Sequence, residues 1–201
     1  MRIIAGSARG RRVAVPSGTA TRPTSDRVRE GLFSVLAAWA GRGGQPAEAS
    51  LAGLSFCDLY SGSGAVGLEA ASRGAGPVLL VEADRRTAAL AQRNAADLEL
   101  SAEVRTARVE DLLRRPVPRA FDVVFADPPY DLGRDQIQSV LFRIAIGGWL
   151  AEKGLAVVER SRRSAPLIWP DILARTWSRT YGETVLEFGA ADNLPETEGG
   201  S

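Results

Sequence analysis

Between residues 54 and 159, short apolar segments alternate regularly with amphipathic helical segments. The pattern predicts strands over 54–58, 77–82, 102–106, 121–126 and 154–159, and helices between them over 65–73, 85–97, 109–114 and 135–147. Parallel strands need long crossover connections, so this order predicts an α/β fold with a mostly parallel sheet and helices on both faces. Two further apolar runs, 175–181 and 184–189, flank Gly182-Glu183 and predict a closing hairpin whose last strand is antiparallel.

The residues before this pattern are strongly basic. Residues 1–43 contain eight arginines against Asp26 and Glu30, a net charge of +6, although the whole chain has a net charge of +1. Such a local excess predicts an anionic partner, nucleic acid rather than a membrane. The arginines that we expect to contact it are Arg2, Arg9, Arg11, Arg12, Arg22, Arg27 and Arg29.

The sequence predicts three segments. Residues 1–40 form a basic extension, with a hairpin from the runs 2–5 and 11–15 and a helix over 26–39 that Thr24 or Ser25 can cap. After a linker over 41–50, residues 51–190 form the main domain, and residues 191–201 are expected to be a disordered tail.

Composition excludes several classes of chemistry. The chain of 201 residues has no histidine, which rules out histidine-based acid–base catalysis and histidine-ligated zinc, and we expect no metal site. The single cysteine, Cys57, lies in an apolar run and is expected to be a buried thiol. Because no segment is typical of a membrane span or a signal peptide, we expect a cytoplasmic protein.

The segment Asp127-Pro128-Pro129-Tyr130 directly follows the predicted buried strand 121–126. Open α/β sheets bind ligands at the carboxyl ends of their strands, so this segment is a candidate site. A carboxylate and a proline carbonyl can each accept one N–H group while the tyrosine ring stacks, which suits a planar base with an exocyclic amine. A proline-rich turn with a surface aspartate is the alternative.

A glycine-rich segment follows the first predicted strand and favours a bound cofactor. Gly62-x-Gly64-x-x-Gly67 after a strand, with Glu82 at the end of the next strand, fits both NAD and S-adenosylmethionine. Asp58 would oppose the pyrophosphate of NAD but suits the ammonium group of a methionine moiety. The closing hairpin and the segment at Asp127 also favour the methyl donor.

These motifs carry a resemblance to a known family. Asp58-x-Tyr60-x-Gly62-x-Gly64 together with Asp127-Pro128-Pro129-Tyr130 resembles class I S-adenosylmethionine-dependent N-methyltransferases that act on exocyclic amines of nucleobases. The N-terminal segments Arg2–Gly6, Gly10-Arg11 and Arg22–Phe33 resemble the small-subunit ribosomal RNA guanine-N2 methyltransferase family (the RsmD type), and the resemblance extends to about residue 189. It implies a Rossmann-like sheet and methylation of N2 of one guanine in 16S rRNA within an assembling small ribosomal subunit.

The resemblance also implies roles for individual residues. It places the cofactor against Asp58, Tyr60, Ser61, Gly62, Gly64 and Glu82, and the target amine against Asp127, Pro128 and Tyr130. The family often has an acidic residue near the adenine of the cofactor, where this chain has Arg108 and Val109. Either the backbone of Val109 makes that contact, or Glu110 or Asp111 substitutes.

Two alternatives remain open at this point. A DNA adenine or cytosine N-methyltransferase could use the same motif, although no separate base-reading domain is visible. A non-catalytic RNA-binding assembly protein is the second. We expect the protein to be a monomer.

Overall fold

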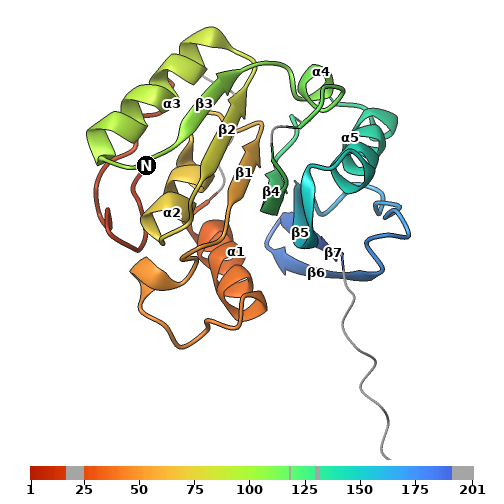
Figure 1. Ribbon diagram of the computed structural model, residues 1–201, viewed down its shortest axis with the longest axis horizontal. Coiled ribbons are helices and arrows are strands. Elements are labelled where there is room, and N and C mark those ends of the chain that lie inside the picture. Colours follow the sequence, from red (N-terminus) through yellow and green to blue (C-terminus); the bar gives the residue numbers. More distant parts are fainter. Residues whose placement is uncertain (17–24, 118, 130–131, 192–201) are drawn as a thin grey trace, which may run out of the picture.

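A seven-stranded sheet forms the centre of the computed structural model, which describes residues 1–16, 25–117, 119–129 and 132–191 (Figure 1). The strand order in this part of the chain is β3-β2-β1-β4-β5-β7-β6. The strands are β1 (Phe56–Leu59), β2 (Val78–Glu82), β3 (Glu103–Thr106), β4 (Phe121–Ala126), β5 (Leu150–Ser161), β6 (Arg175–Tyr181) and β7 (Thr184–Ala190). The first five are parallel, and β7 pairs antiparallel with both β5 and β6, so the predicted sheet and closing hairpin are confirmed.

Helices cover both faces of the sheet. They are α1 (Asp26–Trp39), α2 (Ala65–Ser72), α3 (Arg85–Leu98), α4 (Val109–Leu112) and α5 (Arg134–Ile146), with a short 3₁₀ helix at Ala47–Ala49. Side chains cap two of them: the Ser25 hydroxyl, as predicted, accepts the N–H of Val28 at 3.4 Å, and the Asp84 carboxylate accepts the N–H of Thr87 at 2.8 Å. None of the described helices is long and apolar enough to cross a bilayer.

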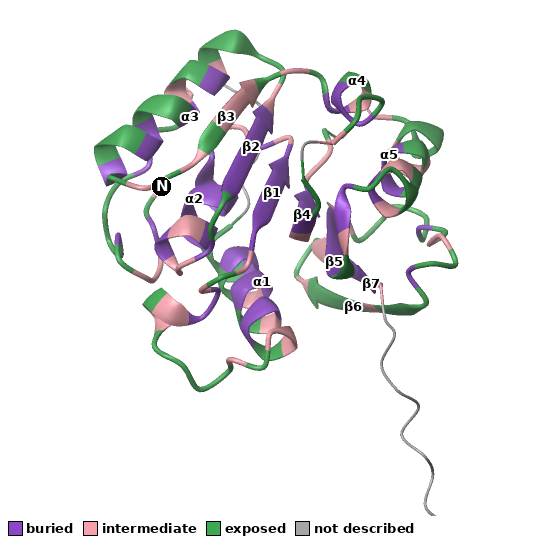
Figure 2. Ribbon diagram, viewed as in Figure 1, coloured by how far each residue is buried: buried purple, intermediate pink, exposed green. Residues whose placement is uncertain are grey.

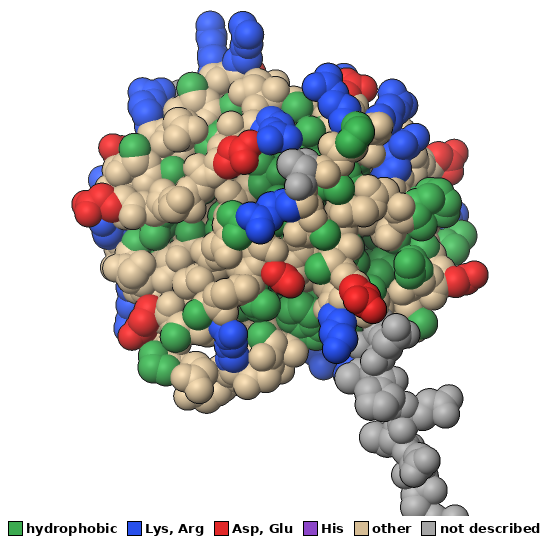
Figure 3. Space-filling view, in the orientation of Figure 1, with side chains coloured by type: hydrophobic (Ala, Val, Ile, Leu, Met, Phe, Trp, Pro, Cys, Tyr) green, Lys and Arg blue, Asp and Glu red, His purple; other side chains and the backbone are tan. Residues whose placement is uncertain are grey.

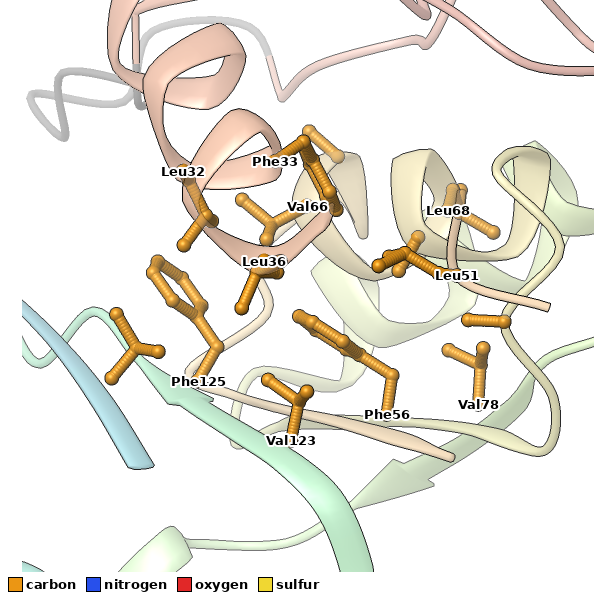
Figure 4. Close-up of a cluster of buried hydrophobic side chains, with 14 of the residues drawn as sticks. Leu32, Phe33, Leu36, Leu51, Phe56, Val66, Leu68, Val78, Val123 and Phe125 are labelled. Atoms are coloured by element: carbon orange, nitrogen blue, oxygen red, sulfur yellow. The ribbon is translucent and has the colours of Figure 1, made fainter. Parts of the chain in front are cut away.

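The hydrophobic core has two halves, one on each side of the sheet. Alternate residues of β4 divide between them: Phe125 belongs to the half under α1, α2 and α3, and Val124 belongs to the half under α4 and α5. Figure 4 shows side chains of α1 and α2 packed over Phe56 and Phe125, and Figure 2 shows that the central strands are buried. Cys57 lies buried in β1, as predicted.

The predicted N-terminal hairpin is present but short. Arg2 and Arg12 form one antiparallel bridge, and the N–H groups of Ile3 and Val13 donate to the carbonyls of Arg11 and Met1 at 3.0 and 2.9 Å. Beyond Ile3 the pairing ends, and the N–H groups of Ile4 and Ala5 donate to the carboxylate of Glu69 on α2 at 2.7 and 2.9 Å. Residues 1–16 are therefore a short hairpin held against α2.

The extension shares its core with the main domain. Ile3 and Val13 belong to the same apolar cluster as residues of α2 and β1. Asn94 on α3 completes the contact: its side-chain amide donates to the carbonyl of Ala14 at 2.9 Å and accepts the N–H of Ala14 at 3.0 Å. Residues 1–16 are thus anchored along both α2 and α3.

Candidate active site

Three acidic residues lie at or near the carboxyl ends of adjacent parallel strands. Asp58 is in β1, Glu82 ends β2, and Asp127 directly follows β4. Leu59 of β1 pairs with Val81 on one side and with Ala126 on the other, so the three carboxylates share one edge of the sheet. This is the edge at which α/β sheets bind ligands.

The glycine loop between β1 and α2 wraps closely around Asp58. Gly64 begins α2 with a φ of +85°, a left-handed conformation that favours glycine. The N–H of Gly67 donates to Oδ2 of Asp58 at 2.8 Å, and a Cβ at Gly67 would lie 2.2 Å from the side chain of Leu80. These contacts explain why the loop needs small residues.

Glu82 fixes the outer side of the same loop. Its carboxylate accepts the N–H of Gly62 at 3.0 Å and the N–H of Asp84 at 2.7 Å. Each carboxylate oxygen has a second lone pair, so Glu82 can hold the loop and still accept a ligand hydroxyl. Its predicted contact with the cofactor stays a prediction.

The electrostatics at Asp58 favour a cationic ligand. Asp58 is only 1% exposed, and burial, together with the neighbouring Asp127 and Glu82, raises its pKa from 3.8 to about 8 despite the hydrogen bond from Gly67. An ammonium or sulfonium group beside these carboxylates would favour the ionised form. The buried hydroxyl of Ser61, which has no hydrogen-bond partner among the described residues, adds a polar atom to the same loop. The residues present therefore fit S-adenosylmethionine.

Tyr60 is held by α4 and not by the glycine loop. Its hydroxyl donates to Oε1 of Glu110 at 2.8 Å, and burial and this acceptor raise the pKa of Tyr60, which keeps the hydroxyl protonated. Arg108 is largely exposed and lies 3.7 Å from Glu110, whereas the side chain of Val109 is buried in the core. Glu110, one of the two expected substitutes for the family's acidic residue, is thus the one that reaches the β1 loop.

A pocket of about 250 Å³ opens beside Asp127 and Pro128. The N–H of Asp127 donates to the carbonyl of Leu59 at 3.4 Å, which ties the segment to β1. The lining comes from the segment after β4, the first turns of α5, the end of β5 and the start of β7: Asp127, Pro128, Pro129, Leu132, Arg134, Ile137, Glu159, Arg160, Ser161, Ser164, Ala165 and Thr184. Tyr130 lies outside the described residues, so its predicted stacking role stays a prediction.

The predicted RNA-binding arginines fall into different groups. The side chains of Arg9, Arg12 and Arg27 are exposed, and they make no hydrogen bond or ion pair with described residues. Arg2 donates to the carbonyl of Gly10 at 2.6 Å, and Arg11 donates to carbonyls at the end of α3. Arg22 lies outside the described residues. On the face in Figure 3, basic and acidic side chains are interspersed, so this view shows no single basic patch.

The prediction for Arg29 is wrong, because its side chain is fully buried. Its guanidinium lies 2.7 Å from Asp26 and 3.5 Å from Glu69, and it donates to the carbonyl of Arg2 at 2.8 Å. Arg29 therefore shares the buried carboxylate of Glu69 with Arg73, whose Nε lies 2.9 Å from it, and holds residues 1–16 in place.

Two residues of the site were missed from sequence. Asn94 joins the extension to the glycine loop, because its amide also donates to the carbonyl of Ser63 at 2.9 Å. Glu159 lines the pocket beside Asp127. An acidic residue at the end of an apolar run is the signal that could have identified Glu159, as it did Glu82 and Asp127.

Comparisons with known proteins agree with this geometry. The family described as Conserved hypothetical protein 95 matches residues 1–190. The ribosomal RNA small subunit methyltransferase D of Haemophilus influenzae is 35% identical over 187 residues, which cover 90% of this chain and 89% of that protein. The Escherichia coli (strain K12) protein of the same name is 35% identical over 161 residues, 79% of this chain and 74% of that protein.

Solved structures show the same fold. The Escherichia coli protein yhhF superposes with a TM-score of 0.80 at 28% identity, covering 96% of this chain and 99% of that chain. The 16S rRNA N2 G1207 methyltransferase (RsmC) of T. thermophilus, solved with AdoMet and guanosine, superposes with a TM-score of 0.62 at 20% identity, covering 89% of this chain and 45% of that chain. The chain therefore belongs to the Conserved hypothetical protein 95 family, the RsmD type of class I methyltransferase, whose cofactor is S-adenosylmethionine.

Proposed function

We propose that the protein methylates N2 of a guanine in 16S ribosomal RNA within an assembling small ribosomal subunit. The observation that carries this proposal is the place of Asp127 and Pro128 in the wall of a pocket at the end of β4. The same sheet edge carries Asp58 and Glu82, which we assign to the cofactor. The names of the relatives that are 35% identical support ribosomal RNA as the substrate class.

The residues around the target amine act by position and charge. Bound S-adenosylmethionine supplies an electrophilic methyl group on a positively charged sulfur. Asp127 and the carbonyl of Pro128 accept hydrogen bonds from the two N–H groups of the guanine N2 amine, which orients its lone pair away from them. The carboxylate of Asp127 also stabilises the positive charge that develops on the nitrogen. Because the chain has no histidine, carboxylates carry this role.

The target base has to leave its stack to enter the pocket, which costs a few kcal/mol. The exposed arginines Arg9, Arg12 and Arg27 can offset that cost by binding phosphates. The extension that carries Arg9 and Arg12 is fixed to the glycine loop through Asn94, so RNA held by the extension lies against a rigid part of the domain.

The proposal is tested with small-subunit particles from a strain that lacks the homologous enzyme. The purified protein should transfer labelled methyl from S-adenosylmethionine to the particles, and nucleoside analysis should identify N2-methylguanosine. N6-methyladenine or N4-methylcytosine on DNA, with no RNA product, would instead support a DNA methyltransferase. No methyl transfer and no cofactor binding in calorimetry would support an assembly protein without catalytic activity.

A further inference from the structure

The lining of the pocket beside Asp127 contains two kinds of polar group. The carboxylate of Asp127 and the carbonyl of Pro128 are the acceptors that we assign to the target amine. The same lining includes Arg134 from the first turn of α5 and the hydroxyl groups of Ser164 and Thr184. Guanidinium and hydroxyl groups donate hydrogen bonds to phosphate oxygens, which accept them. The pocket therefore offers partners for two parts of one nucleotide, its base and its phosphate.

Of the two arginines in this lining, one is already used within the protein. The side chain of Arg160 is 6% exposed, pairs with Glu187 at 3.2 Å and donates to the carbonyl of Ala165. Arg134 is exposed, and its side chain makes no hydrogen bond or ion pair with any described residue. Arg134 can therefore bind an anion without breaking a contact inside the protein.

The arginines at the turn of the N-terminal hairpin are too far from this pocket to take the same role. Arg11 donates to the carbonyl of Leu98, the last residue of α3. This helix starts beyond the carboxyl end of β2 and has 14 residues, which span about 21 Å. The pocket opens at the carboxyl ends of β4 and β5, and Figure 1 shows the hairpin and α5 at opposite sides of the view. The hairpin can hold RNA at a distance, but not the phosphates next to the target base.

We propose that Arg134 binds one of the two phosphates that flank the target guanosine and so positions this nucleotide over Asp127. The inference rests on the proposed function, in which the pocket holds the guanine amine. A flanking phosphate is joined to its base through a single ribose, so a cation in the lining of the base pocket lies within its range. The positive charge of Arg134 also offsets the repulsion between that phosphate and the carboxylate of Asp127.

The test combines a change in the enzyme with a change in the RNA. Small-subunit particles are assembled with RNA in which an uncharged methylphosphonate replaces the phosphate on the upstream or on the downstream side of the target guanosine. The full chain is compared with Arg134→Ala and with Arg134→Lys, which keeps the positive charge. The matched control is Arg143→Ala, which removes the same charge near the other end of α5, at a residue that does not line the pocket.

On RNA with its natural phosphates, Arg134→Ala should lower kcat/KM by about 10- to 100-fold, mainly through KM, because it removes a hydrogen bond between charged groups. The slope of the salt dependence of RNA binding should fall by up to about 1, and Arg134→Lys should restore most of both losses. Affinity for S-adenosylmethionine should not change.

The modified RNAs identify the contact itself. One of the two methylphosphonates should cost the parent about 10- to 100-fold in kcat/KM. It should cost Arg134→Ala at most about threefold, since changes to the two partners of one contact are not additive. Arg143→Ala should remain as sensitive to this methylphosphonate as the parent is.

Two results would overturn the inference. A parent that neither methylphosphonate slows would do so without any variant, and therefore does not depend on whether a variant folds. An Arg134→Ala protein that melts like the parent and keeps the full sensitivity of the parent to the methylphosphonates would do so as well. Failure of the proposed function is seen separately, as absence of N2-methylguanosine when the parent acts on RNA with its natural phosphates, and the inference would then fall with it.

Discussion

The buried carboxyl group of Asp58 should make the stability of the free protein fall as the pH rises. In the unfolded chain this group ionises near its ordinary pKa of 3.8, whereas burial and the neighbouring Asp127 and Glu82 raise the pKa in the folded protein to about 8. Between these values the unfolded state loses the proton and the native state keeps it. The free energy of unfolding therefore falls by about 1.4 kcal/mol per pH unit, on the order of 4 kcal/mol by pH 7.

The substitution Asp58→Asn isolates this contribution. Asparagine has nearly the same size, stays neutral, and offers an oxygen to the N–H of Gly67. Without cofactor, the variant should be more stable than the parent by a few kcal/mol at pH 8, and the difference should vanish near pH 4. Urea denaturation across this range measures the difference, and other titrating groups cancel between the two proteins. Asp135→Asn, at an exposed carboxyl group on α5, is the control and should show no such trend.

The same carboxyl group should make cofactor binding depend on pH, with the opposite sign. A cationic ligand favours ionised Asp58, so binding releases a proton and the affinity of the parent should rise by up to tenfold per unit between about pH 6 and 7.5. Asp58→Asn should bind S-adenosylmethionine more weakly, and its affinity should change little over this range. Calorimetry in two buffers of different ionisation enthalpy measures the number of protons that are released when the cofactor binds. Equal affinities for parent and variant, or a parent affinity that is flat in pH, would refute the reasoning.

Further changes test the other parts of the site. Asp127→Asn should lower turnover by roughly 10²–10³ with cofactor affinity retained, as labelled-methyl transfer and calorimetry can show. Asn94→Ala should destabilise the protein by about 1–3 kcal/mol in urea, because it leaves the buried carbonyl of Ser63 and the partly buried backbone groups of Ala14 without partners. Replacing Arg9 and Arg12 with alanine should weaken RNA binding and lower the slope of its salt dependence by up to about 2, and an unchanged slope would exclude them as phosphate contacts. Arg29→Ala should destabilise the fold by about 1–3 kcal/mol, because it removes the donors to the carbonyl of Arg2 and to one oxygen of Glu69, although Arg73 still pairs with Glu69 at 2.9 Å.

Much of the fold could be predicted because its signals are local. The bounds of α1 and β4 agree with their periodicity, 26–39 and 121–126. The first residues of β5 could not be predicted, because Ala151-Glu152-Lys153 has no apolar alternation and Leu150 pairs with Phe121 across a register shift. The N-terminal hairpin forms but is shorter than predicted, since the distant carboxylate of Glu69 binds the N–H groups of Ile4 and Ala5.

The strand-end acids of the site could also be predicted. In a parallel sheet, residues that follow buried strands meet at one edge, so Glu82 and Asp127 could be placed together from sequence. Contacts between residues from different elements of the site could not be predicted in this way. The contact between Tyr60 and Glu110 depends on how β1 and α4 meet across fifty residues. The neighbourhood of Asp127 and Glu159 depends on strand order, which periodicity does not contain.

The net charge of residues 1–43 was an incomplete guide to RNA binding, because a count of charges does not distinguish surface arginines from a buried one. Arg29 lies between Val28 and Leu32 on the buried face of α1, and Glu69 follows Leu68 on α2, so two opposite charges within apolar stripes form a buried pair. A charge of +6 therefore overstates what the extension can offer to RNA. Each phosphate contact contributes up to about 0.9 to the salt slope, so the exposed side chains of Arg9, Arg12 and Arg27 account for a slope of about 2 to 3. The buried arginine acts on RNA binding only indirectly, by holding residues 1–16, which carry Arg9 and Arg12.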